Sequence, residues 1–247
     1  MKLRSLACTR IYNNQVAWCL YRMELRFLEI YRSSEYVLLL IQGVANSLSL
    51  TILAGISGFV LATILAGTRY FEIPLLRQIC TCFVEFTRNT PLIVQLFFFA
   101  FGLPILLGYQ WPFWAHALLA LTLNFSAYFS EILRAGFQSI EDGQKEAALS
   151  LGISSTVLFF KIIFPQAVSK TFPSLSSQFI FLFLTTGIIS EIGVVDLTQA
   201  GIFIDSRTFR SFEVFITLTI LYVFLSIFLK LLLSTLQKYF FSWRFVA

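Results

Sequence analysis

Long runs of residues without a charged side chain constrain this sequence most, and the first of them is 36–68. An α-helix rises about 1.5 Å per residue, so a hydrocarbon core of about 30 Å needs roughly 20 apolar residues. The run therefore predicts one membrane-spanning helix with residues to spare. With 57% hydrophobic and 13% charged residues and a mean hydropathy of +0.81, the composition excludes a soluble domain, a disordered chain, a disulfide scaffold and a nucleic-acid binder built on basic patches.

The remaining uncharged runs predict four further spans. The gap between Arg88 and Glu131 is too long for one helix. Residues 102–104 and 108–112 combine glycine and proline, so they are expected to split it into two helices. Residues 171–190 supply the fourth span, and residues 214–237, interrupted only by Lys230, supply the fifth. The sequence thus predicts an all-α, polytopic membrane protein with about five transmembrane helices, in a membrane domain over residues 36–240.

The basic residues predict how this domain is oriented, because Lys and Arg are retained in cytoplasmic loops. If 134–170 lies inside, five alternating spans also place 69–88 and the C-terminus inside. The basic residues gathered there are Arg69, Arg77, Arg88, Arg134, Lys145, Lys161, Lys170, Lys230, Lys238 and Arg244. Outside, the loop 105–113 carries none and the loop 196–212 carries only Arg207 and Arg210. A cytoplasmic C-terminus and an external N-terminus are therefore expected.

The N-terminal tail, residues 1–35, conflicts with this orientation. Six basic residues precede the first span on the side where few should lie, and most of them belong to residues 1–22. A true start at Met23 removes the conflict. A signal peptide is the alternative, but the polar stretch 9–15 interrupts any sustained apolar core. We favour the later start.

The cysteines and the single histidine do not predict a metal site. Cys80 and Cys82 lie near a helix end without a histidine partner, so buried thiols are the simpler expectation. His116 stands alone at the outer end of the third span, where an interfacial position is expected.

Small residues mark one face of the first span. Ala54, Gly58, Ala62 and Ala66 recur every four residues, which places them on one side of a helix. Small side chains let a second helix approach closely. This stripe predicts a helix–helix contact and no binding function.

The segment 131–165 is charged and too long for a simple connection, so it is expected to be structured. A capping box at Ser139–Asp142 predicts a helix that ends at Gly152, and a second helix from Ser154 or Ser155 to a break at Pro165. The exposed apolar residues would be Leu149, Leu151, Val157 and Leu158. Two interpretations stay open: the corner docks into a partner's groove, or it lies on the membrane surface.

The same segment resembles the EAA loop of inner-membrane permeases of bacterial ABC importers. The resemblance rests on Glu146-Ala147-Ala148, three residues, Gly152, nine residues, Ile162, and then Phe164-Pro165. Other stretches are similar to the polar amino-acid uptake branch, of the histidine, arginine and glutamine type; they are Phe86–Leu96, Ala127–Gly136 and Ile192–Leu197. Where relatives in that branch commonly carry a Lys-Asp pair before Thr-Ser, this chain reads Phe183-Leu184-Thr185-Thr186-Gly187.

The resemblance implies a permease subunit of an ATP-driven importer of a polar amino acid, in the bacterial inner membrane. It implies a coupling loop at about 135–166 that is seated in a cytoplasmic ATPase, with Glu146, Ala147, Ala148, Gly152 and Pro165 as the coupling residues. A second permease chain and an external solute-binding protein are the other implied partners. No cofactor is expected, and ATP is expected on the partner subunit. The sequence agrees independently, since none of its 12 glycines lies in a G-x-x-x-x-G-K-[ST] phosphate loop.

Polar residues inside the spans are candidates for the solute path, because they are costly when they face lipid. Asn124, Tyr128 and Glu131 are spaced i, i+4 and i+7 on the third span and so share a face. The other candidates are Gln95, Gln178, Thr185 and Thr186. A structural hydrogen bond to a neighbouring helix is the competing interpretation, above all for Asn124 and Gln178. Pairing or headgroup contact is expected for Arg88 and Glu131.

Two alternative functions belong to other classes. An ion-coupled secondary amino-acid carrier would need ionisable residues within the spans, but Glu131 and Glu191 lie near span ends. A non-transporting membrane scaffold would explain the missing Lys-Asp pair but not the intact coupling loop.

Overall fold

The computed structural model describes residues 33–242, and within these residues the regular structure is entirely helical, as the sequence predicts. The two candidate starts, Met1 and Met23, and the tail around them lie outside the described residues. The helices in chain order are α3 (Ser34–Tyr70), α4 (Leu76–Arg88), α5 (Leu92–Phe97), η1 (Phe98–Gly102), α6 (Leu103–Leu107), α7 (Phe113–Gln138), α8 (Asp142–Ser150), α9 (Ser155–Leu158), η2 (Phe159–Ile163), α10 (Phe164–Thr185), η3 (Thr186–Ile192), α11 (Leu197–Thr208) and α12 (Ser211–Phe240).

Three helical runs within 33–242 are long and apolar enough to cross a membrane: α3, the run Ser155–Ile192 and α12. At about 1.5 Å per residue, the 37 residues of α3 extend about 55 Å, well beyond the hydrocarbon thickness. A fourth span exists if α4 and the following helix count as one, although they meet at 106°. The predicted total of five remains a prediction, since α7 is not among these runs.

Of the two breaks predicted between the second and third spans, only the turn at 108–112 is present. Residues 102–104 continue a helix, because the π-helical turn η1 carries the chain into α6 and Pro104 falls in the first turn of α6, where a missing N–H is tolerated. The sharp bend lies at 89–91 instead. Pro91 disfavours helical geometry at Thr90, so α4 ends at Arg88. The expected turn at 108–112 is present, with Gly108 at a φ of +70°.

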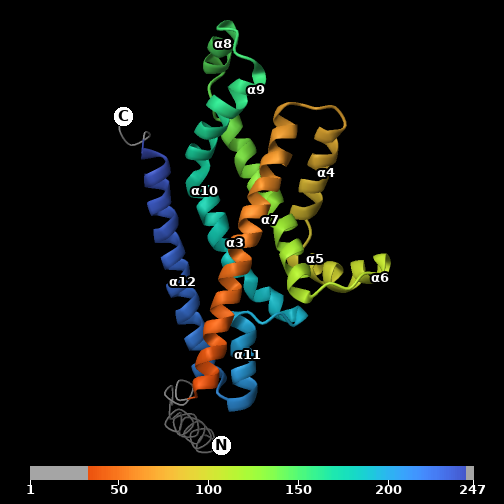
Figure 1. Cartoon of the computed structure of the whole chain (residues 1–247), viewed down its shortest axis with the longest axis vertical. Helices are drawn as coiled ribbons and strands as arrows, with labels where there is room; N and C mark the ends of the chain where they lie inside the picture. Colours follow the sequence, from red (N-terminus) through yellow and green to blue (C-terminus); the bar gives the residue numbers. More distant parts are fainter. Residues whose placement is uncertain (1–32, 243–247) are drawn as a thin grey trace, which may run out of the picture.

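The predicted stripe of small residues forms the contact between α3 and α7, which run side by side through the centre of the molecule (Figure 1). Ala54, Ala62 and Ala66 are completely buried. A Cβ at Gly58 would lie 3.4 Å from the carbonyl oxygen of Thr122, so the two backbones approach closely. This prediction is confirmed.

The two ends of the molecule carry different elements (Figure 1). The loop between α3 and α4, the α8–α9 corner and the end of α12 lie at one end. The start of α3 and the short helix α11 lie at the other. These groupings bring the candidate coupling loop to the same end as the α3–α4 loop and the end of α12, and the side that this end faces stays a prediction. Residues 76–88, predicted to lie inside, form helix α4 of the bent pair.

Candidate functional site

The corner between α8 and α9 is closed by backbone hydrogen bonds around Gly152. Gly152 has a φ of +76°, a left-handed conformation that glycine adopts without steric cost. The Ile153 N–H donates to the Ala148 carbonyl at 3.1 Å, and the Gly152 N–H donates to the Leu149 carbonyl at 2.9 Å. This is the Schellman arrangement of a helix C-terminus. The sequence prediction that α8 ends at Gly152 is confirmed.

The start of α8 differs from the predicted capping box. The Ser139 hydroxyl donates to the Gly136 carbonyl at 2.7 Å and therefore closes α7. Glu141 holds the N-cap position of α8 without a side-chain cap. Asp142 lies in the first turn and accepts a hydrogen bond from Lys145 at 2.8 Å, which lowers the pKa of the Asp142 carboxyl. A negative charge there suits the positive end of the α8 dipole.

The predicted break at Pro165 is absent. The chain is helical without interruption from Ser155 to Ile192, and Pro165 lies in the first turn of α10. The π-helical turn η2 immediately precedes it and shifts the hydrogen-bond pattern, so the missing proline N–H leaves no gap in the helix. The corner is therefore joined directly to a membrane-spanning helix.

The outer face of the corner combines exposed apolar and charged residues. Leu149 and Leu151 are 51% and 80% exposed, and Val157 is 50% exposed. Glu146 and Ala147 are exposed beside them. Ala148 is buried, so it packs within the corner and does not face outward. Leu158, which the sequence places on the outer face, is also buried.

An aromatic cluster anchors the corner to the long helices. Phe159 is 1% exposed, and its ring lies 5.1 Å from Tyr70 at the end of α3 and 5.2 Å from Phe137 at the end of α7. Phe164 at the start of α10 packs against both Phe137 and Phe159. Since Phe159 contacts residues of three long helices, the corner, α3, α7 and α10 meet in one packed junction.

Two of the predicted path residues, Gln95 and Asn124, bind each other. The Asn124 side-chain amide donates to the side-chain oxygen of Gln95, Oε1, at 3.1 Å, and both side chains are buried. The Gln95 amide donates to the Thr87 carbonyl at 2.8 Å and to the Thr90 hydroxyl at 2.6 Å. The bonds of Gln95 to Thr87 and Thr90 span the bend between α4 and α5. The helix–helix hydrogen bond of the competing interpretation is present, and a role in the solute path stays a prediction.

The other predicted path residues are dispersed. Tyr128 is half-buried, and the guanidinium of Arg88 lies 5.6 Å from the centre of its ring. Gln178 is half-buried on α10. The Thr185 hydroxyl donates to the Phe181 carbonyl, and the buried Thr186 hydroxyl donates to the Phe183 carbonyl. The two threonines therefore bond within their own helix.

Glu131 has more partners than the sequence indicates. Its carboxylate pairs with Arg69 from α3, accepts a bond from Arg134 Nη2 at 2.8 Å, and lies 3.7 Å from Arg88 Nη1. Structural pairing, one of the two roles expected for Arg88 and Glu131, is present, and the two residues pair with each other. Arg69 and Arg134 were missed, although Arg134 is three residues from Glu131 and Arg69 ends the first uncharged run. The carboxylate thus links α3, α4 and α7.

His116 and the thiols depart in part from expectation. His116 is only 2% exposed and stacks on Tyr109 with a ring separation of 5.7 Å, so it is packed among aromatic rings, and its expected position at the membrane interface stays a prediction. Cys80 is buried as predicted, but Cys82 is exposed. Within residues 33–242, no group of three or more His, Cys, Asp and Glu side chains is arranged to hold a metal ion.

Comparison with known proteins agrees with this architecture. Residues 58–244 match the family described as binding-protein-dependent transport system inner membrane component. The chain is 35% identical over 161 residues to an L-cystine transport system permease protein of Bacillus subtilis, covering 62% of this chain and 67% of the relative. It is 36% identical over 152 residues to an arginine transport system permease protein of the same organism, covering 61% and 69%.

A solved structure described as an amino acid ABC transporter with histidines is similar over almost its whole length. The TM-score is 0.79 at 33% identity, with 87% of this chain and 99% of the other covered. The family match spans well over half of the chain, and the fold of a known importer subunit is reproduced. The chain therefore belongs to the family of inner membrane components of binding-protein-dependent transport systems, the multi-pass permease subunits of ABC importers whose ATP is hydrolysed on a separate subunit.

Proposed function

We propose that this chain forms the translocation path for a polar amino acid, delivered by an external binding protein and moved by a cytoplasmic ATPase. The substrate class is supported by relatives that are described as arginine and L-cystine permeases. A second permease chain, identical or different, would complete the path. The chain itself would need no cofactor.

The observation that carries the proposal is the corner at Gly152. Its outer face exposes Leu149 and Leu151 at the end of the bundle that also holds most of the basic residues. Exposed apolar side chains of this size favour a protein partner, because water does not stabilise them. We assign the contact with the ATPase to Glu146, Ala147, Leu149 and Leu151. Gly152 gives the turn, Ala148 packs inside it, and Pro165 begins the helix that follows.

The corner also has the connections that a coupling element needs. Helix α7 leads into it, the run Ser155–Ile192 leads out of it, and the Phe159 cluster joins it to α3. The Lys170 ammonium donates to the Ser139 carbonyl at 3.0 Å and ties α10 to the chain just before α8. Movement of the ATPase would therefore reach α3, α7 and α10 together, as a rigid-body transition.

The orientation follows from the same arrangement. The corner and the end of α12 would be cytoplasmic, and the N-terminus and α11 external. Labelling tests this directly. In sealed cells, a membrane-impermeant amine reagent added outside should leave Lys145 unmodified, and modification of Lys145 would reverse the topology and overturn the proposal.

Reconstitution tests the activity. The ATPase encoded with this chain should co-purify with it, and the complex should accumulate radiolabelled L-arginine or L-glutamine in vesicles only when ATP and the binding protein are present. Leu151→Asp should release the ATPase while leaving the chain in the membrane. Uptake that is driven by an ion gradient without ATP would instead favour a secondary carrier, and a complex that takes up neither solute would favour a scaffold.

A further inference from the structure

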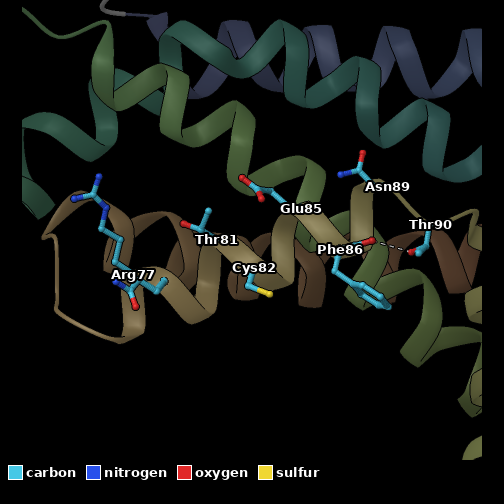
Figure 2. Close-up of a pocket in the computed structure, with 8 residues that line it drawn as sticks. Arg77, Thr81, Cys82, Glu85, Phe86, Asn89 and Thr90 are labelled. Atoms are coloured by element: carbon cyan, nitrogen blue, oxygen red, sulfur yellow. Dashed lines mark hydrogen bonds between the residues drawn. The ribbon is translucent and has the colours of Figure 1, made fainter.

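Helix α4 carries a row of polar side chains along one face. Thr81, Glu85 and Asn89 are spaced four residues apart, and Gln78 continues the same face toward the helix start. Figure 2 shows Thr81, Glu85 and Asn89 projecting from one side of α4, while Cys82 and Phe86 project from the other. The face is strongly polar, although α4 and the helix after it are together long and apolar enough to form one membrane span.

This polar row lies in an open groove of about 750 Å³. The lining residues are Arg77, Gln78, Thr81, Cys82, Glu85, Phe86, Asn89 and Thr90. Two of them are charged. Arg77 at the helix start is neutralised by Glu72 at 2.8 Å. Glu85 is exposed and forms no ion pair or hydrogen bond through its carboxylate with any side chain in residues 33–242. The groove lining therefore contains one carboxylate that no cation within residues 33–242 pairs with.

The other intramembrane candidates contrast with this row. Gln95 and Asn124 satisfy each other, and Glu131 is surrounded by arginines. A free carboxylate that faces lipid within a span is costly. Ionisable residues in spans accordingly face a water-filled path or a partner of opposite charge. Glu85 meets this condition only if its groove is hydrated or receives a cation.

We propose that the α4 groove is a section of the solute path, in which Glu85 binds the ammonium group of the transported amino acid. The carboxylate forms a charge-assisted hydrogen bond with the ammonium. Thr81 and Asn89 supply neutral hydrogen-bonding groups one turn to either side. The groove thus favours zwitterionic and cationic amino acids over anionic ones. This inference rests on the proposed function and assigns part of the path to residues of α4.

Uptake by charge variants gives the first test. In reconstituted complexes with ATP, Glu85→Gln should lower the initial uptake of radiolabelled L-arginine or L-glutamine about tenfold, the equivalent of one lost charge-assisted contact. Glu85→Asp should retain most of the uptake. Glu35→Gln, which removes an exposed carboxylate from the first turn of α3, is the matched control and should transport like the unaltered chain. Normal uptake by Glu85→Gln would overturn the inference.

Thiol accessibility gives the second test, and it separates a solute path from a covered interface. The parent for this test is a chain whose four cysteines are replaced by serine. Thr81→Cys, which lines the same groove and keeps Glu85, should react with a water-soluble, cationic methanethiosulfonate reagent. L-Arginine or L-glutamine at about 10 mM, which saturates a site of millimolar affinity, should slow that reaction. Ile79→Cys lies on the apolar side of α4, outside the groove lining, and should not be protected.

The outcomes are distinguishable. An unreactive Thr81→Cys that forms a disulfide with a second permease chain would show that this face is a helix–helix interface, and the inference would be wrong. Loss of ATP-driven uptake by the unaltered complex would contradict the proposed function itself. Uptake by that complex together with an unprotected Thr81→Cys would contradict only the assignment of the groove.

Discussion

The side-chain amide nitrogen of Asn124 lies 3.1 Å from the side-chain oxygen of Gln95, across the contact between α7 and α5. This bond is one of the few that hold the bent segment α5–α6 against the long helices. It also explains why two residues that look like path candidates are both buried. Polar side chains in a membrane protein can satisfy each other and thereby serve packing.

A double-mutant cycle measures that bond. Asn124→Ala and Gln95→Ala should each destabilise the folded protein, and their coupling energy should be about 0.6 kcal/mol and no more than about 1.7 kcal/mol. Denaturation in detergent is the measurement. If either variant lost transport while keeping its stability, Asn124 and Gln95 would have a direct role in the path.

Substitution of Gly152 tests the corner. Gly152→Val should abolish ATP-driven uptake while ATP hydrolysis and membrane insertion persist, because a β-branched residue at a φ of +76° costs roughly 1–2 kcal/mol or more and reshapes the turn. Nothing lies within 4 Å of the new Cβ, so the effect comes from the backbone alone. Gly143→Val makes the same change inside α8, also in open space, and should leave uptake intact. Equal effects of the two variants would argue against a special role for the turn.

The Phe159 cluster predicts opposite results at adjacent positions. Phe159→Ala should destabilise the protein by about 3–5 kcal/mol, since it removes a ring that is 1% exposed and packed against Tyr70 and Phe137. Phe160 is 56% exposed, so Phe160→Ala should cost much less. Apparent melting temperatures of the two variants provide the comparison, and similar values would show that the junction is not a packed core.

Asp196 predicts a dependence of stability on pH. Its carboxylate accepts a bond from the Gln199 N–H at 2.8 Å and caps α11, yet burial raises its pKa to about 6. Between pH 4 and 6 the folded state therefore binds more protons at this group than the unfolded state. This contribution makes the protein less stable as pH rises toward 6, and the loss is complete above that value.

Asp196→Asn should remove this dependence. Asparagine also caps helices but carries no charge, so the variant should melt at a higher temperature than the unaltered protein at pH 8 and differ little from it at pH 4.5. Melting in detergent across this range is the measurement. A pH profile that is unchanged by the substitution would mean that another group is responsible.

Two glycines of α3 should respond differently to alanine. At Gly43 a Cβ would lie 2.8 Å from the Asp196 carbonyl oxygen and 2.9 Å from Leu197 Cα, both backbone atoms that cannot move aside easily. At Gly58 the nearest atom is 3.4 Å away, close to ordinary contact. Gly43→Ala should therefore lower the melting temperature, whereas Gly58→Ala should be neutral or slightly stabilising because alanine favours helix. The opposite order would contradict the packing described for these two sites.

The sequence predicts the helices best where charge marks their ends. The uncharged run 36–68 lies within α3, which begins at Ser34 and ends at Tyr70, and the run 214–237 lies within α12. The turn at Gly152 was also predictable, because a left-handed residue after good helix formers favours glycine. These features depend on local composition, which a single sequence records.

The errors arise where one interaction replaces another. Pro104 and Pro165 both follow a π-helical turn that absorbs the missing N–H, so neither breaks its helix. Ser139 caps the end of α7 instead of the start of α8. The partners of Gln95 and Glu131 come from distant parts of the chain, and no spacing in the sequence reveals them. Glu85 was overlooked for the opposite reason, since it is notable for the partner that it lacks within the described chain.

The helical run from Ser155 to Ile192 has a mechanical consequence. Its 38 residues would extend about 57 Å, so its two ends lie on opposite sides of a bilayer of ordinary thickness. Leu175, near the middle of the run, is buried in the core. Pro173 lies inside the run and removes one helical hydrogen bond, so the run has a point of weakness between Ser155 and Ile192. A push on the corner would therefore bend the run at this proline before it displaced the far end.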